Sequence, residues 1–215
     1  MGFRLPNGST VEVASAYAAA VAVAAIANAS PAVATAAGHT LQNGDIVLVE
    51  SGWAGLNGRL ARVTGVAADN FSLEGFDTTN TAKYPAGSGI GTVKKITTWV
   101  QVPQVTEVAT SGGEQQFATF GFLEEDEDRQ LPTTKSPSSM TLTVADDPAQ
   151  PYVAVVEAAD EGRGLEAARL NLPDGSSILY GAYLSITQTP TLSRNNIMTR
   201  AITLSLAGRT TRYSA

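Results

Sequence analysis

The sequence predicts a mainly β protein with one α-helix and a small all-β domain inserted after the first strand. Short runs of β-branched and aromatic residues, separated by Gly, Asn and Asp turns, fill residues 38–96. Longer alternating stretches begin after them, and one helical apolar pattern lies further on. We therefore expect a discontinuous core from residues 1–19 and 97–215, an inserted domain from residues 20–96, and a long acidic loop from residues 110–137 within the core.

Two hairpins are expected in the N-terminal part. Pro6-Asn7-Gly8 is strong turn chemistry, because Asn and Gly tolerate positive φ, and it predicts a hairpin over residues 3–13. Asn28–Pro31 separates the segments Val21–Ile26 and Ala32–Thr35, which predicts a second hairpin. Helix is an alternative for this second region because alanine is abundant there.

The inserted domain is expected to be a small barrel or sandwich. Ile46–Val49 is an uninterrupted apolar run typical of a buried strand, and Arg59–Val66 and Phe71–Leu73 follow at strand spacing. Residues 77–92 are rich in Thr, Gly and Ser and predict a loop. The glycine-rich segment Gly52–Gly58 lacks the Lys-Ser/Thr ending of a phosphate-binding loop.

The core is expected to place long strands on both sides of a single helix. Thr97–Val108 precedes the helix, and Ile197–Gly208 alternates apolar and polar residues near the C-terminus. Leu165–Leu172 and Ser176–Thr187 are predicted to pair as a hairpin about Pro173-Asp174-Gly175.

Residues near position 150 carry the signals of that helix. Asp147 is the expected N-cap, with Pro148 in the first turn and Gln150 completing a capping box. The expected apolar face follows i, i+3, i+4, i+7 spacing and consists of Tyr152, Val155, Val156 and Ala159. Gly162 or Gly164 is expected to end the helix.

Composition excludes several classes of site. The 215 residues contain no cysteine, so neither a disulfide nor a thiolate metal site can form. His39 is the single histidine, which excludes a His-pair zinc site, and no motif supplies a nucleophile with an oriented base. We expect no catalytic residue, no cofactor and no metal, and therefore no enzyme. The charge-free residues 13–37 are rich in weakly apolar alanine and interrupted by Pro31, so we expect a soluble segment and no membrane contact.

Charge is unevenly distributed along the chain. The net charge of −6 argues against a protein that grips DNA or RNA. Residues 105–162 carry 12 acidic side chains against Arg129 and Lys135, whereas residues 163–215 carry six arginines against two acidic residues. Such segments can pair head to tail between subunits or neutralise each other within one subunit, and the sequence leaves both possibilities open.

Three C-terminal segments carry a family likeness: Arg169–Gly175 (RLNLPDG), Tyr180–Ile186 (YGAYLSI) and Thr199–Leu204 (TRAITL). With the order of strands and the single helix, they resemble the ending of siphophage, lambda-like major tail tube proteins. The resemblance covers residues 97–215 and the N-terminal strand. Residues 20–96 have no counterpart in the minimal family pattern and look like a small β module added to a phage structural protein.

The resemblance implies a tail-tube β-sandwich or barrel whose copies close into a homohexameric ring. It also implies that rings stack along a tape-measure protein, between tail terminator and distal tail proteins, in a virion tail assembled in the host cytoplasm. DNA would leave through the lumen without specific binding. Elementary physics agrees, because unpaired strand edges drive association and a basic lumen would retain the duplex through phosphate contacts, so a chain of net charge −6 suits a channel through which DNA slides.

The expected ring-to-ring interface joins the acidic run to arginines of the adjacent ring. Its candidate residues are Glu124, Glu125, Asp126, Glu127, Asp128, Arg194, Arg200 and Arg209. A solvated charged tip is the plain alternative, and a Ca²⁺ loop is not expected because the alternating ligands and central Gly are missing.

The alternative function is a baseplate- or fibre-associated binding protein whose inserted domain contacts the host surface. In the tube reading, residues 20–96 are expected to be dispensable for polymerisation.

Overall fold

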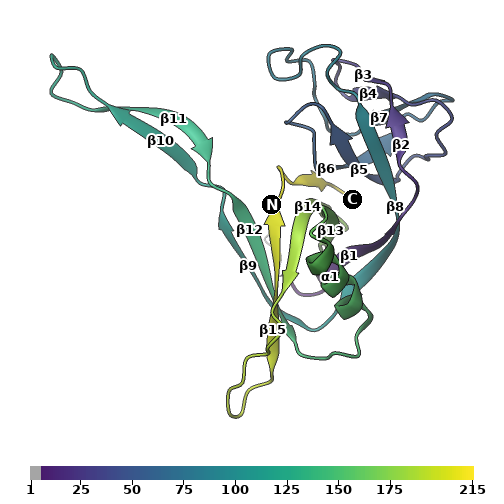
Figure 1. Ribbon diagram of the computed structural model, residues 1–215, viewed down its shortest axis with the longest axis vertical. Coiled ribbons are helices and arrows are strands. Elements are labelled where there is room, and N and C mark those ends of the chain that lie inside the picture. The colour runs from purple at the N-terminus through teal and green to yellow at the C-terminus, as the bar shows by residue number, and fades with distance from the viewer. Residues whose placement is uncertain (1–5) are drawn as a thin grey trace.

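The computed structural model describes residues 6–215, which fold into one continuous antiparallel sheet, a projecting hairpin and one helix (Figure 1). The first arm of the hairpin expected over residues 3–13 lies partly outside the described residues. The core part of the sheet has a single spatial order: β8 (Gly91–Val102), β1 (Thr10–Tyr17), β13 (Glu166–Asn171), β14 (Ser177–Ile186), β15 (Thr199–Leu206), β12 (Ser138–Ala145) and β9 (Val105–Gly112). The short strand β16 (Thr211–Tyr213) pairs with the start of β14.

The inserted module continues the same sheet beyond β8. Its strands are β2 (Val21–Val23), β3 (Ala25–Ile26), β4 (Ala32–Thr35), β5 (Ile46–Ser51), β6 (Arg59–Thr64) and β7 (Asn70–Leu73), in the spatial order β3-β4-β7-β6-β5-β8, with β2 also on β8. β3 and β4 pair across Asn28–Pro31, so the second hairpin prediction is confirmed. The expected boundary between residues 96 and 97 falls inside β8, which pairs with β5 before it and with β1 after it. The division into domains stays a prediction.

The continuous apolar run of β5 has a structural cause, because both faces of this strand are buried. Val47 and Val49 point into the core of the inserted module, while Leu48 points to the opposite side. There Leu48 packs with Leu60 and with side chains of the main core, including Leu179. A half-exposed strand would alternate apolar and polar residues; burial on both faces removes the alternation.

A shared hydrophobic cluster packs the inserted module against the core. It joins module residues to core residues and consists of Ala14, Leu48, Leu60, Ile96, Ala167, Leu179 and Tyr213. Beside it, the backbone carbonyl of Gly58 lies so close to Gly181 of β14 that a Cβ at Gly181 would collide with it. The module is therefore in direct backbone contact with the core sheet.

The helix α1 (Pro151–Gly162) begins later than the sequence predicted. Its N-cap is Gln150, without a side-chain cap, and Pro151 occupies the first turn. The Asp147 carboxylate instead stabilises the preceding turn, accepting from the Ala149 N–H at 3.2 Å and the Gln150 side-chain amide at 2.7 Å. Proline tolerates the first helical position because its missing N–H would have no partner there, which favours Pro151 as the start.

One face of α1 packs against β14 and contributes to the main core. Its buried residues are Tyr152, Val153, Val156 and Ala159, so Val153 takes the place expected for the half-buried Val155. Burial of Val156 alone contributes about 1.5–3 kcal/mol. The helix ends at Gly162, one of the two expected positions, but the left-handed residue that caps it is Arg163, with φ of 50°, and not a glycine. No helix among residues 6–215 has the length and apolar character needed to cross a membrane.

The span 110–137 is not the loop that the sequence predicted. β9 extends to Gly112, and β10 (Gln115–Phe120) pairs with β11 (Arg129–Lys135) as an antiparallel ribbon that leaves the body of the subunit (Figure 1). We call residues 113–136 the arm. Neither face of the arm is covered, so its strands lack the alternation that marks a half-buried strand. Main-chain pairing holds it together instead.

Candidate assembly interface

The arm grows out of the core ribbon β9–β12 at a glycine pair. Gly112 and Gly113 both have positive φ, 78° and 79°, and a Cβ at Gly112 would collide with the Pro137 carbonyl oxygen. Hydrogen bonds continue through this bend, because the Gly113 N–H donates to the Ser136 carbonyl at 3.2 Å and the Glu114 N–H donates to Ser136 Oγ at 3.0 Å. Two glycines thus redirect the ribbon without breaking it.

Large apolar side chains are exposed along the arm. Phe117 is 53% exposed, Leu131 is 58% exposed and Leu123 is fully exposed. Phe122 stacks edge-on against Phe120, with ring centroids 5.6 Å apart, and is itself half exposed. An isolated two-stranded hairpin is marginally stable in water, and exposed apolar surface marks interaction sites. The arm therefore has the properties of a segment that another molecule covers.

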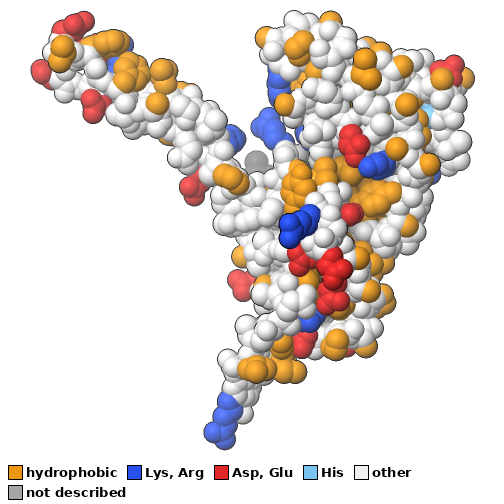
Figure 2. Space-filling view, in the orientation of Figure 1, with side chains coloured by type: hydrophobic (Ala, Val, Ile, Leu, Met, Phe, Trp, Pro, Cys, Tyr) orange, Lys and Arg blue, Asp and Glu red, His pale blue; other side chains and the backbone are white. Residues whose placement is uncertain are grey.

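The acidic run lies at the outer end of the arm. Glu125 forms an ion pair with Arg129, whose guanidinium lies 5.7 Å from the Phe122 ring centroid. The other four carboxylates have no ion-pair partner among residues 6–215; they are Glu124, Asp126, Glu127 and Asp128. Figure 2 shows acidic side chains on the outer part of the arm.

A second projection carries Arg194. It is the connection between β14 and β15, residues 187–198. This connection projects from the end of the subunit that lies away from the arm (Figures 1 and 2). Leu192 and Ile197 are 74% and 65% exposed on it, and a bridge between Thr191 and Thr199 closes its base. Arg194 itself is exposed. The acidic tip and Arg194 are thus too far apart to meet within one subunit.

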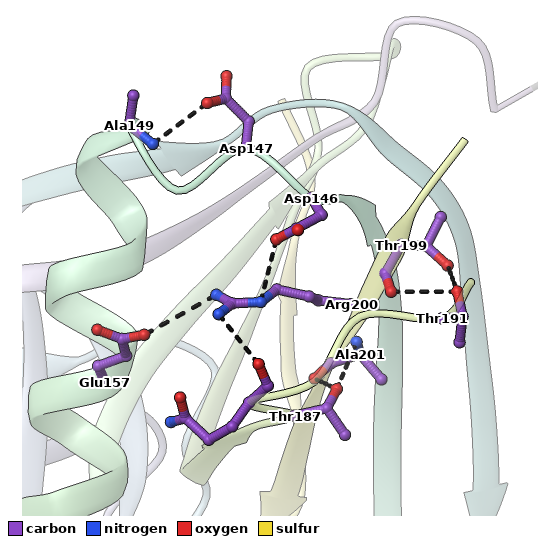
Figure 3. Close-up of polar contacts among 10 residues, drawn as sticks. Asp146, Asp147, Ala149, Glu157, Thr187, Thr191, Thr199, Arg200 and Ala201 are labelled. Atoms are coloured by element: carbon purple, nitrogen blue, oxygen red, sulfur yellow. Dashed lines mark hydrogen bonds and ion pairs between the residues drawn. The ribbon is translucent and has the colours of Figure 1, made fainter.

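Arg200 makes its polar contacts within its own subunit (Figure 3). Its Nε lies 3.1 Å from Asp146 Oδ1, its Nη1 lies 3.8 Å from Glu157 Oε1, and its Nη2 donates to the Gln188 carbonyl at 3.4 Å. The side chain is only 12% exposed. These contacts tie β15 to the turn before α1, to α1 itself and to the base of the 187–198 connection. The structure therefore gives Arg200 a role within the fold, whereas the sequence suggested a surface role.

Arg209 is exposed in the connection between β15 and β16, and its backbone carbonyl accepts a hydrogen bond from Arg59 Nε at 3.2 Å. Within one subunit the structure brings none of the three candidate arginines into an ion pair with the acidic run. Sequence reasoning missed the exposed apolar side chains of the arm. The aromatic residues Phe117, Phe120 and Phe122 within an otherwise polar segment were the available signal.

Strand β9 forms one edge of the large sheet. It pairs with β12 on one side and has no strand on the other among residues 6–215. Seven of its eight residues are exposed, including Val108. An unpaired edge offers main-chain donors and acceptors to a strand of another chain. Among residues 6–215 there is no group of three or more His, Asp or Glu side chains that could hold a metal ion.

Comparison with known proteins gives one family. The family described as phage tail tube protein, TTP, matches residues 51–215. No curated protein matches the chain.

Similar solved structures include an anti-feeding prophage cap and two assemblies of an extracellular contractile injection system. The anti-feeding prophage tube-terminating cap has a TM-score of 0.38 and 21% identity, covering 54% of this chain and 83% of that one. The sheath–tube complex of the PVC extracellular contractile injection system has a TM-score of 0.39 and 16% identity, with the same coverages. The PVC sheath/tube terminator has a TM-score of 0.38 and 15% identity, covering 53% of this chain and 87% of that one.

Proposed function

This chain belongs to the phage tail tube protein family, as the resemblance of its C-terminal segments predicted, and we propose that it is the self-assembling subunit of the tube. The mainly β fold with a single helix is the fold expected for such a subunit. The family is structural, and the proposed role requires contacts between copies of the chain and no catalysis.

The arm is the observation that carries this proposal. It projects from the subunit with the apolar side chains of Phe117, Leu123 and Leu131 exposed to solvent. This exposure costs free energy in an isolated subunit, and burial against another copy offsets that cost. The unpaired edge of β9 lies in the core ribbon from which the arm extends, and it can add main-chain hydrogen bonds to a neighbour. Both features serve self-association.

We propose a homohexameric ring whose copies join through sheet edges and whose rings stack through the arm. A closed contact within the ring together with a head-to-tail contact between rings generates a filament. The further partners are a tape-measure protein in the lumen and terminator and distal tail proteins at the ends. DNA would pass through on ejection without specific binding. The assignment to siphophages, with assembly in the host cytoplasm, rests on the resemblance of residues 169–204.

Electron microscopy of the purified full-length chain tests the proposal. The tube subunit is expected to form rings or polymers at high concentration. The alternative, a baseplate- or fibre-associated protein whose inserted module contacts the host surface, predicts trimers or monomers in the same images. A chain that remains monomeric and is absent from purified virions would overturn the tube proposal.

A variant in which a short Gly-Ser turn replaces residues 114–135 tests the role of the arm. None of the buried core clusters includes an arm residue, so the subunit is expected to keep its thermal unfolding midpoint. It is expected to lose stacked polymers in sedimentation and electron microscopy. A milder variant with Glu124–Asp128 replaced by the neutral amides should also keep its fold and lose stacking. Unchanged tube yield from both variants would contradict the assigned role.

A further inference from the structure

An open cleft lies where the base of the arm faces the inserted module. Its volume is about 1080 Å³, and its walls come from the arm base, from the connection between β15 and β16, and from two module residues. Four of the lining residues are cationic and none is acidic: Arg59, Lys83, Lys135 and Arg209. Figure 2 shows basic side chains in the hollow between arm and module.

These four cations lack carboxylate partners. Residues 6–215 contain 13 Lys and Arg side chains, of which seven form ion pairs. Of the six others, four line this cleft. The subunit therefore concentrates most of its unmatched positive charge in one concave place, and a cleft lined by one sign of charge focuses the field on an incoming ligand of the opposite sign.

Arg59 shows how crowded this positive charge is. Its Nε donates to the Arg209 carbonyl at 3.2 Å and its Nη2 donates to Thr211 Oγ1 at 3.2 Å, which fixes the guanidinium at the cleft wall. Burial, and after it the like charge of Arg209, lowers the pKa of Arg59. An anion entering the cleft would relieve this repulsion.

The arm tip is the matching group on the same chain. It carries four unpaired carboxylates, Glu124, Asp126, Glu127 and Asp128, next to the exposed Phe122 and Leu123. The cleft offers four unpaired cations beside the aliphatic side chains of Leu206, Ala207 and Pro137. Charge and apolar surface thus occur together on both sides, which favours a protein segment over a simple polyanion.

We propose that this cleft receives the acidic arm tip of a second copy of the chain. The proposal rests on the tube function above and names the receiving surface of the arm. A subunit cannot fill its own cleft, because the cleft includes the arm base: the six residues of β10, at about 3.4 Å each, hold the tip about 20 Å away. The tip and the cleft that receives it therefore belong to different copies, and placed head to tail between rings this contact is heterologous and repeats from ring to ring.

Charge reversal in the full-length chain tests the contact. The cleft variant carries Lys83→Glu, Lys135→Glu and Arg209→Glu, all at exposed positions, and leaves the hydrogen-bonded Arg59 unchanged. The tip variant carries Glu124→Lys, Asp126→Lys and Glu127→Lys. Each variant alone is expected to lose at least about tenfold in sedimentable polymer, because like charges then face each other across the contact. The matched control is Arg163→Glu, an exposed and unpaired arginine at the end of α1.

Two rescues distinguish a direct contact from a general effect of charge. A chain with all six reversals has the wild-type net charge and a basic tip facing an acidic cleft, so it should polymerise again. An equimolar mixture of the cleft and tip variants should also polymerise, because each tip then matches the other variant's cleft. Failure of both rescues would overturn the proposed contact.

The outcomes separate this contact from the tube function itself. Wild-type polymer together with undiminished polymer from the cleft variant would overturn the tip–cleft contact and leave the tube function standing. Wild-type chain that never polymerises would overturn both. Loss of short-duplex DNA binding in the cleft variant, with polymerisation unchanged, would assign the cleft to phosphate groups and overturn the protein contact.

Discussion

The phenol of Tyr213 accepts a hydrogen bond from the backbone N–H of Arg62 at 2.8 Å, and the Arg62 guanidinium lies 4.4 Å from the centroid of the same ring. Tyr213 also donates to the Glu74 carbonyl at 3.0 Å. Because Tyr213 belongs to the C-terminal strand β16 and Arg62 to strand β6, this residue pair fastens the end of the chain to the inserted module. The ring also fills the cluster shared by module and core.

Replacing Tyr213 by Phe should lower the free energy of unfolding by about 1–3 kcal/mol, because the Arg62 N–H and the Glu74 carbonyl lose their shared partner. Urea denaturation followed by circular dichroism measures the change. Tyr183→Phe is the matched control, since Tyr183 is half exposed. Loss of its hydroxyl group should change the free energy of unfolding by less than about 0.5 kcal/mol. Equal effects of the two substitutions would contradict the assignment.

Stability is expected to fall at alkaline pH. Burial raises the pKa of Tyr213, and burial together with the neighbouring Glu166 raises the pKa of Tyr17. In the unfolded chain a tyrosine loses its proton near pH 10, whereas these two phenols keep theirs in the folded protein. Their contribution is therefore complete below pH 10 and is lost as the pH rises above that value toward the folded-state pKa.

Thermal unfolding midpoints between pH 9 and pH 11 test this dependence. The decline should be shallower in the double variant Tyr17→Phe/Tyr213→Phe, which has no buried proton to lose at these positions. A decline of the same steepness in the variant and the wild type would assign the pH dependence to other groups.

Arg200→Met should destabilise the free subunit by about 3 kcal/mol, because it leaves the Asp146 carboxylate, which is only 14% exposed, without its counter-charge. Arg163→Met provides the control, as this side chain is exposed and unpaired. Chemical denaturation of unassembled protein is the appropriate measurement. If Arg200 served a neighbouring subunit, its loss would instead spare the free subunit and weaken assembly alone.

Gly181→Ala should destabilise the protein by about 1–3 kcal/mol, because the new Cβ must push the Gly58 carbonyl away and loosen the seat of the inserted module. Gly162→Ala is the control, since a Cβ there meets nothing within 4 Å. Differential scanning calorimetry of both variants gives the comparison. An unfolding midpoint for Gly181→Ala equal to that of the control would show that the module shifts without cost.

Local signals in the sequence predicted much of the fold. The hairpin about Pro173-Asp174-Gly175 forms as expected, because its turn residues and the apolar alternation on both arms act over short distances. Ile46–Val49 is a buried strand as its composition indicated.

Features that depend on distant partners were not predictable from a single sequence. The strands of the arm bury neither face, so the sequence pattern of residues 110–137 predicts a loop. The partners of Arg200 lie at Asp146 and Glu157, and only the packing of α1 against the sheet brings them together. The cleft combines residues from five separated stretches of chain, so no local sequence pattern predicts it.

The shared cluster also changes the expectation for the inserted module. Simple removal of residues 20–96 would take away Leu48 and Leu60 and expose the core residues Leu179 and Tyr213. It would also cut β8 in the middle of a strand. That the module is dispensable for polymerisation stays a prediction, and a deletion that tests it needs polar replacements on the uncovered core surface.

Because the acidic tip and the basic cleft occupy different places on one subunit, a stack joined by them has a direction. One end of such a stack exposes unoccupied basic clefts and the other end exposes unbound acidic arm tips, so the two ends grow through different contacts. A protein that stops growth at the first must offer carboxylates, and one that initiates or seals the second must offer lysine or arginine.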